Sequence, residues 1–297
     1  MADNVKTGVV IATYKRDKEL KRALESLVGQ TYKGFEVVLV DDSADSAWQQ
    51  RVKDIAKEFE SSLNIKLITN KVNLGSAASR NEGIKNSSGE YITFLDDDDI
   101  YLPEKIEKQL ADVEKAGADY ALTDLYLYYD NGEIAERRTR DYIKSYEPEE
   151  LLRYHLLYHM TGTDTFMFKK EYLQKIGGFP PIDVGDEFYL MEQAILNGGK
   201  CCYSPHCYVK AYVHKGEEGG LSSGQGKIAG ENALHEEKKK HFGELKRSDV
   251  RQINARHYAV LAFAHLRLKK YPAFASNAAK AALISPKGCI KILKKRI

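Results

Sequence analysis

The first hundred residues alternate between two hydrophobic periods, and this alternation limits the chain to a small set of folds. Between the strand-like runs, apolar residues recur at helical spacing, as at Leu20, Leu24 and Leu27. Two short apolar runs, GVVIAT at 8–13 and FEVVLV at 35–40, have the character of strands buried on both faces, and IKLIT at 65–69 and YITFL at 91–95 are predicted as the third and fourth strands. Strands that alternate with helices in this order predict a mostly parallel sheet covered by helices on both faces.

The rest of the chain is less regular, and its elements are predicted one at a time. Residues 215–227 are rich in glycine and serine, which is typical of a loop, and from about residue 228 the pattern is helical. The other predicted elements are helices at 103–117 and 185–199, a strand over 120–134 that turns at Asn131-Gly132, a strand and short helix over 165–179, and a strand at 208–214.

Polar residues follow each of the four predicted strands. TYKR comes after the first, Asp41-Asp42-Ser43 after the second, NKVNLG after the third and DDDD after the fourth. Because parallel strands end at one edge of a sheet, these clusters fall on the edge where such folds bind ligands. A solvated turn explains any one of them, but their coincidence favours a single ligand site.

The run Asp96 to Asp99 indicates a divalent cation, because adjacent carboxylates repel one another unless a positive charge lies among them. Carboxylate oxygens suit Mg²⁺ or Mn²⁺, whereas no His/Cys set suits zinc and the twelve-residue calcium loop is absent. A metal at this edge favours a nucleotide diphosphate. The phosphate-binding motifs G-x-x-x-x-G-K-[ST] and G-x-G-x-x-G are both missing, which disfavours a P-loop enzyme and a dinucleotide-binding one.

Five segments in order, VVIATYKR, FEVVLVDDSADS, NLGSAASRNEGI, GEYITFLDDDD and GDEFYL, resemble family 2 glycosyltransferases over roughly residues 6–215. The resemblance implies an inverting enzyme of the GT-A fold that uses a nucleotide-diphosphate sugar, preferably a UDP-sugar, with Mn²⁺ or Mg²⁺. It also implies a cell-surface glycan or its lipid-linked precursor as acceptor. The core halves are then 1–100 for the nucleotide and 101–215 for the acceptor, with a lid and helical basic tail at 216–297.

The resemblance assigns the nucleotide side of the site to residues at the ends of the first two strands. Thr13, Tyr14 and Arg16 are implied to line the base pocket. Asp42 is implied to accept a hydrogen bond from N3–H of a uracil, with Asp41 close by.

The diphosphate and metal side is implied to involve Arg80, near the ribose or diphosphate, and the family's D-x-D pair, Asp96 and Asp98. Of this pair, Asp98 is the expected metal ligand and Asp96 binds the ribose or sugar. Asp97 assists either of them, and Asp99 is expected to be a solvated or helix-capping neighbour.

Two further features follow from the resemblance. His214 is a candidate metal or phosphate ligand, although a lone histidine is more often structural, and the glycine-rich loop is either a lid over the donor or a linker. The family's catalytic base lies in an acidic pair, usually Glu-Asp, at the start of a helix. Here the order is reversed, Asp186-Glu187, and alignment on the following helix makes Glu187 the base with Asp186 as its rival. If neither serves, Asp164 and Asp183 are the next candidates.

Composition adds limits on partners and location. The net charge of +2 gives no reason to expect a nucleic acid partner, and no apolar run has the length of a membrane span or of a secretory signal. Adjacent Cys201 and Cys202 fit no common zinc spacing. Because neither a secretory signal nor a membrane span is recognised, a cytoplasmic, reduced protein is expected. The basic, apolar segment SPKGCIKILKKRI suits contact with an anionic membrane at the inner face of the plasma membrane, or a solvated terminus.

Two other functions remain open at this point. A nucleotidyltransferase acting on a sugar phosphate also places carboxylates and a metal at a sheet edge, but it should carry a glycine-rich loop after the first strand, and ATYKRDKEL has no glycine. A non-catalytic module that binds a sugar nucleotide is the second alternative.

Overall fold

The computed structural model describes residues 5–182, 184–213 and 224–286, and the chain divides into two compact units. The first unit comprises residues 1–151 and 160–213, and the second comprises 152–159 and 214–297. None of the described helices combines the length and apolarity that crossing a bilayer requires.

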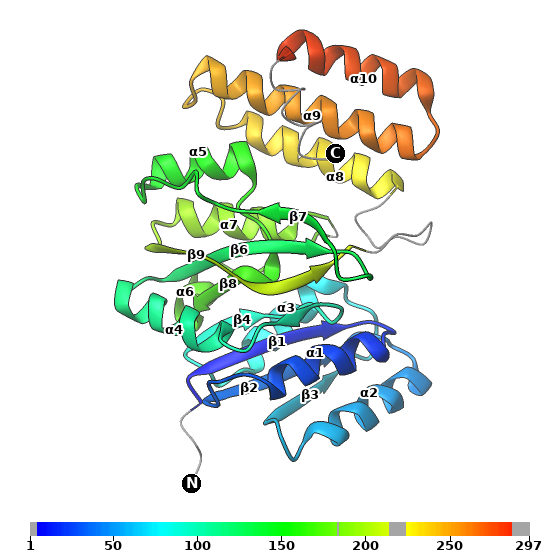
Figure 1. Cartoon of the computed structure of the whole chain (residues 1–297), viewed down its shortest axis with the longest axis vertical. Helices are drawn as coiled ribbons and strands as arrows, with labels where there is room; N and C mark the ends of the chain where they lie inside the picture. Colours follow the sequence, from blue (N-terminus) through cyan, green and yellow to red (C-terminus); the bar gives the residue numbers. More distant parts are fainter. Residues whose placement is uncertain (1–4, 183, 214–223, 287–297) are drawn as a thin grey trace. The chain divides into compact units, whose positions relative to one another are not determined.

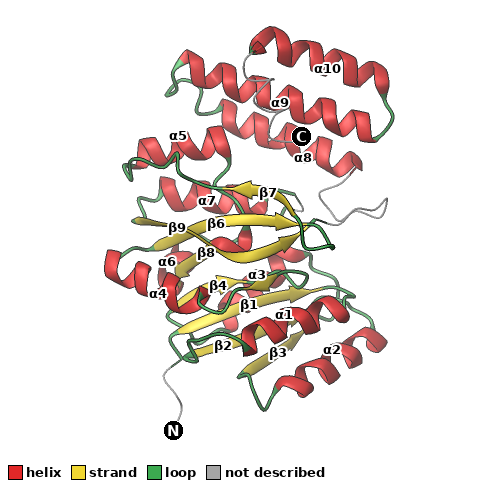
Figure 2. Ribbon diagram, in the orientation of Figure 1, coloured by secondary structure: helices red, strands yellow, loops and turns green. Residues whose placement is uncertain are grey.

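Within its described residues, the first unit is built on one sheet in the order β3-β2-β1-β4-β8-β6-β9-β5, with β7 paired to β6 (Figures 1 and 2). Its strands are β1 (Thr7–Thr13), β2 (Phe35–Asp41), β3 (Ile65–Thr69), β4 (Tyr91–Phe94), β5 (Ile100–Tyr101), β6 (Tyr120–Tyr128), β7 (Ile134–Arg138), β8 (Phe166–Lys169) and β9 (Cys201–Tyr212). Its helices are α1 (Lys18–Val28), α2 (Ser46–Phe59), α3 (Ser76–Asn86), α4 (Lys105–Ala116), α6 (Lys170–Lys175), α7 (Asp186–Leu196) and the 3-10 turn η1 (Thr163–Thr165).

The chain order of the first four strands creates a switch point between β1 and β4. Strands β1, β2 and β3 run parallel side by side, and the chain then crosses back so that β4 pairs parallel with β1 on its other side. Crossovers between parallel strands are right-handed, so their direction decides which face their helix covers. The crossovers from β1 to β2 and from β2 to β3 place α1 and α2 over one face of the sheet, and the return from β3 to β4 places α3 over the other (Figure 1). Ligands of open parallel sheets bind where the strand order reverses in this way.

The packing on each face follows the apolar periods of the sequence. Leu20, Leu24 and Leu27 of α1 are fully buried in one core cluster with side chains of α2, β1 and β2. On the opposite face α3 lies close against β1, since a Cβ at Gly83 would be only 2.4 Å from Cγ1 of Val10. The strands and helices predicted for the first hundred residues are therefore confirmed, and β3 at the edge of the sheet is only partly buried.

The second half of the sheet is mixed in direction. Strand β8 is inserted antiparallel between β4 and β6, whereas β9 runs parallel to β6 and antiparallel to β5. Strand β9 begins at Cys201, earlier than the predicted residue 208, and α8 begins at Gly224 inside the predicted loop 215–227. Helix α5 (Pro148–Tyr158) was not predicted, although Pro148 followed by two glutamates is typical of a helix start.

The described part of the second unit is helical. Its helices are α8 (Gly224–Lys239), α9 (Arg247–Arg267) and α10 (Tyr271–Ile284), together with the end of α5, and α9 packs between α8 and α10 (Figure 1). Arg153, in the α5 part of this unit, forms an ion pair with Asp249 of α9, with 2.7 Å between Nε and Oδ2.

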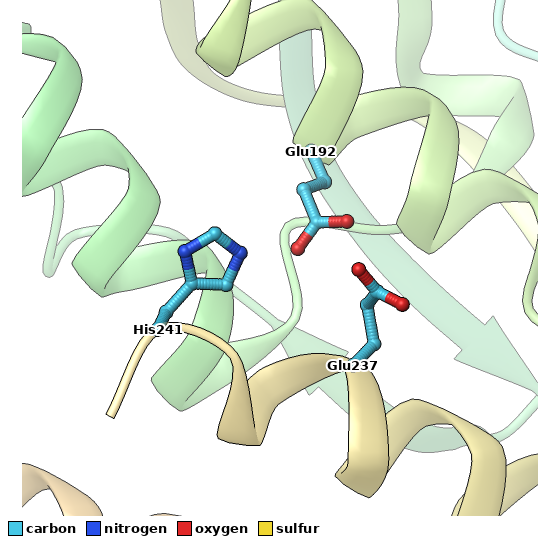
Figure 3. Close-up of side chains that lie close together, drawn as sticks. All are labelled: Glu192, Glu237 and His241. Carbon is cyan, nitrogen blue, oxygen red and sulfur yellow. The ribbon is translucent and has the colours of Figure 1, made fainter. Parts of the chain in front are cut away.

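Two clusters of polar side chains occur inside this helical unit. The Nε2 atom of His159 lies 2.5 Å from Nζ of Lys238 and 2.6 Å from Nη1 of Arg256. Burial, and then these two cations, hold the pKa of His159 well below its usual value, so the ring is neutral. Glu237 on the last turn of α8 and His241 just beyond it direct their side chains to the same side (Figure 3), and Glu237 also forms an ion pair of 2.6 Å with Lys240.

Candidate functional site

The predicted meeting of polar residues at one sheet edge occurs where β1 and β4 end. Thr13 is the last residue of β1, and the aspartate run begins two residues after β4. The Thr13 hydroxyl donates to Oδ2 of Asp97 at 2.8 Å, and both side chains are buried. The switch point of the sheet is thus lined by the residues that the sequence placed there.

The loop after β1 binds the middle of the aspartate run. Nη1 of Arg16 donates to Oδ1 of Asp97 at 2.8 Å and to Oδ2 of Asp98 at 2.5 Å. Burial raises the pKa of Asp97 to about 6, against the opposing effect of Arg16. Tyr14 keeps 49% of its surface exposed, so an aromatic face is available beside this ion pair.

Asp42, which directly follows β2, holds the loop that leads into α3. The Asp42 carboxylate accepts from the Asn70 amide and from the backbone N–H groups of Leu74 and Gly75, at 2.8, 2.8 and 2.9 Å. A carboxylate can accept about four hydrogen bonds, so one acceptor position remains for a ligand. Asp41 is fully buried, and its Oδ2 atom has no hydrogen-bond partner among the described residues.

Arg80 of α3 connects two acidic parts of the site. Its guanidinium donates to Oδ1 of Asp96 at 2.6 Å and to Oδ2 of Asp186 at 3.1 Å, and it lies 5.3 Å from the ring centroid of Phe179. Burial lowers the pKa of this guanidinium, but the two carboxylates outweigh that effect and raise it, so Arg80 stays charged. No pattern in the sequence predicts the contact of this arginine with the start of α7.

Three carboxylates from two distant segments gather beside Arg80. Oxygen atoms of Asp96, Asp99 and Asp164 all lie within 4.8 Å of one another. Asp164, in η1, accepts from the backbone N–H of Asp96 at 2.6 Å and shares a hydrogen bond with Asp99. Burial, and then the charge of Asp96, raise the pKa of Asp164 to about 8, although the hydrogen bond with Asp99 opposes this shift. This close group of oxygen ligands fits Mg²⁺ or Mn²⁺.

A buried lysine lies near this acidic group. Lys105 has no exposed surface, and its Nζ atom donates to the hydroxyl of Tyr101 at 2.8 Å and to that of Thr93. Burial holds the pKa of Lys105 well below its usual value, although Asp164 opposes this effect. Lys105, Thr93 and Tyr101 therefore form a buried polar cluster of their own near the acidic group.

The sequence of the chain matches the model of glycosyl transferase family 2 over residues 8–177, more than half of its length. The chain belongs to glycosyl transferase family 2. An uncharacterized glycosyltransferase of Methanocaldococcus jannaschii is 33% identical over 182 residues, which are 59% of this chain and 59% of that protein. The chain spans about 40 to 60% of the length of the curated relatives that it matches first.

Solved structures show the same fold at low sequence identity. Residues 1–349 of TarS from S. aureus, in complex with UDP-GlcNAc, superpose with a TM-score of 0.62 at 20% identity, covering 92% of this chain and 90% of that one. A mannosyltransferase from Pyrobaculum calidifontis, in complex with GDP-Man and Mn²⁺, gives a TM-score of 0.61 at 17% identity, covering 97% and 79%. The predicted GT-A fold with a helical C-terminal region is thereby confirmed.

The acidic pair expected in this family opens α7, and its two members differ in surroundings. Asp186 is buried against Arg80, and burial raises its pKa to about 6 although Arg80 opposes the shift. Glu187 accepts on Oε2 from the backbone N–H of Gly162 at 2.8 Å and from the Thr163 hydroxyl at 3.2 Å. The loop before η1 thus orients Glu187, and Asp186 neutralises Arg80.

Some sequence-based assignments are corrected or extended by this geometry. Asp99 is 5% exposed and belongs to the acidic group with Asp96, so it is not a solvated neighbour. Asp164, considered only as a reserve base, is the third member of that group. His214 and Asp183 lie outside the described residues.

Proposed function

We propose that this protein transfers a sugar from a nucleotide-diphosphate donor, preferably a UDP-sugar, to an acceptor hydroxyl with inversion at the anomeric carbon. The observation that carries the proposal is the contact of Arg80 with both Asp96 and Asp186. It joins the aspartate run at the sheet edge to the acidic pair of α7, so donor-binding and acceptor-activating groups form one site. By family resemblance, the acceptor is a cell-surface glycan or its lipid-linked precursor.

The donor is proposed to lie over the ends of β1 and β2. Thr13, Tyr14 and Arg16 form one wall, and the remaining acceptor position of Asp42, with Asp41 beside it, offers a partner for a base N–H. The two similar structures named above hold UDP-GlcNAc and GDP-Man, which supports a nucleotide-diphosphate sugar as the class of donor. Uracil is preferred here on the family resemblance.

A divalent metal, Mn²⁺ or Mg²⁺, is proposed to bind at the carboxylates next to Arg80. Asp96 is common to the sequence-based pair with Asp98 and to the structural group with Asp99 and Asp164. When bound, the ion would stabilise the negative charge that develops on the departing diphosphate. Arg80 lies against Asp96 and is placed to neutralise the same charge.

Glu187 is proposed as the general base. In a direct displacement the acceptor oxygen bonds to the anomeric carbon, the bond from that carbon to the diphosphate breaks, and the hydroxyl proton must be taken up. Both hydrogen bonds to Glu187 fall on Oε2, which leaves Oε1 to accept that proton. Asp186 is less suited to this role, because it is the buried counterion of Arg80.

The test compares Glu187→Gln with Asp186→Asn in a sugar-transfer assay, alongside UDP binding measured by calorimetry with Mn²⁺. Loss of a general base lowers turnover about 10²–10⁴-fold, and donor affinity should be unchanged because Glu187 serves the acceptor. Asp186→Asn should show a smaller loss of turnover. If Asp186→Asn is the inactive variant, the two roles are exchanged. If both variants turn over at the wild-type rate, the base assignment is wrong and Asp164 becomes the next candidate.

A further inference from the structure

The last part of the sequence carries positive charge without any acidic residue. From Val250 to Ile297 there is no Asp or Glu, but there are eleven Lys and Arg residues. The whole chain holds 45 basic and 43 acidic residues, so this segregation is a local property of the C-terminal part of the sequence. A surface of one charge favours a partner of the opposite charge.

Helix α10 presents an apolar face that the described residues of its own unit leave exposed. Ala281, on the side toward α9, is 1% exposed and is the only buried residue of the helix. On the outward side Tyr271 is 61% and Leu283 is 83% exposed. The exposed apolar residues between them are Pro272, Ala275, Ala279 and Ala282. From Tyr271 to Leu283 this strip is about 18 Å long, at 1.5 Å per residue.

The turn between α9 and α10 adds cations at one end of this strip. Arg267, Lys269 and Lys270 are all exposed, and Leu266 beside them is 39% exposed. We call the outward side of α10 together with residues 266–270 the docking face. It combines aliphatic side chains, an exposed tyrosine and clustered cations on one helical hairpin.

We propose that the docking face binds an anionic lipid surface. Cations next to an interfacial aromatic and aliphatic strip match a layer of anionic headgroups over hydrocarbon. A nucleic acid would use the cations but would leave the aliphatic strip in water. Another copy of the chain would bring two positive faces together. The proposal does not depend on the transfer reaction proposed above.

The test is cosedimentation of the full chain with phosphatidylcholine vesicles, with and without phosphatidylglycerol. The wild-type chain should bind the vesicles that contain phosphatidylglycerol, and less so as salt screens the charges. Replacing Lys269 and Lys270 by Glu should weaken partitioning at least about tenfold, since each cation near such a surface contributes on the order of 1 kcal/mol. Replacing Tyr271 and Leu283 by Ser should also weaken it at least about tenfold, because the buried apolar contact is lost. Leu196→Ser on α7 is the matched control, because Leu196 is 51% exposed outside the docking face and should have no effect.

The outcomes separate the docking face from other modes of binding. All the substituted side chains are exposed, so thermal unfolding should be the same for each variant. The proposal is overturned if wild-type protein ignores the anionic vesicles, or if only deletion of residues 287–297 abolishes binding. It is also overturned if light scattering shows that the serine variant loses an oligomer, which would assign the face to a second copy. Binding to RNA with no binding to vesicles would refute it as well.

Discussion

In the absence of metal, we expect Asp164→Asn to stabilise the protein at neutral pH. Asp164 and Asp99 share a hydrogen bond inside a group of three carboxylates, and burial raises the pKa of Asp164 from 3.8 to about 8. The folded chain therefore keeps a proton that the unfolded chain releases near pH 4. This contribution to stability is complete below the unfolded pKa and is lost as the pH rises toward 8.

The size of the effect follows from the pKa difference. At pH 7.5 retaining that proton costs about 5 kcal/mol, at about 1.4 kcal/mol per pH unit, as an upper limit. An asparagine needs no proton. Its Oδ1 can still accept from the backbone N–H of Asp96, which lies 2.6 Å from the present oxygen, and its amide can donate to Asp99. The variant should thus exceed the wild type in free energy of unfolding by about 1–5 kcal/mol at pH 7.5 and by less than about 1 kcal/mol at pH 4.5.

Urea unfolding followed by circular dichroism, at both pH values and with EDTA, measures this difference. Asp54→Asn on the exposed surface of α2 is the control and should change stability at neither pH. Adding Mn²⁺ should stabilise the wild type more than Asp164→Asn, since the variant loses one carboxylate of the proposed metal group. A variant that is less stable than the wild type at pH 7.5 in EDTA, or a difference independent of pH, would refute the reasoning.

Three further predictions concern the site and the sheet beneath it. Asp42→Ala should lower affinity for UDP more than for CDP, which lacks the N3–H, and equal losses in calorimetry would remove Asp42 from base recognition. Asp98→Asn should weaken Mn²⁺-dependent UDP binding without unfolding the protein. If UDP affinity is the same in this variant and in the presence of EDTA as in the wild type with Mn²⁺, Asp98 is not a metal ligand. Gly83→Ala should destabilise the fold by about 1–3 kcal/mol in urea, because its Cβ would lie 2.4 Å from a methyl group of Val10. Gly29→Ala, whose Cβ would meet nothing closer than 3.6 Å, is the neutral control, and equal stability of the two variants would contradict the packing argument.

Much of the fold could be predicted from the sequence because its signals are local. Apolar runs such as GVVIAT and the helical spacing of Leu20, Leu24 and Leu27 depend on neighbours within one element. The sheet edge was also predictable, because parallel strands end on the same side. Helix α5 was not predicted, although Pro148 and two glutamates mark its start.

The partners of the acidic residues were decided only by the tertiary structure. Asp96 to Asp99 are adjacent, yet the turn directs Asp97 and Asp98 toward Arg16 and the other two toward Asp164. Asp164 is 68 residues from Asp96 and reaches it because β8 inserts antiparallel beside β4.

The contact between Arg80 and Asp186 was also decided only by the tertiary structure. Arg80 and Asp186 are 106 residues apart, and their contact requires α3 and α7 to be packed around one sheet. Sequence patterns report which face of an element is apolar, so they determined the sheet, its helices and the edge where polar residues gather. They carry no record of which distant loop fills the space beside a carboxylate. The crossover to β4 and the insertion of β8 decided which loops lie beside these carboxylates. A buried charged group must be paired, and its partner can only be a residue that the fold places next to it.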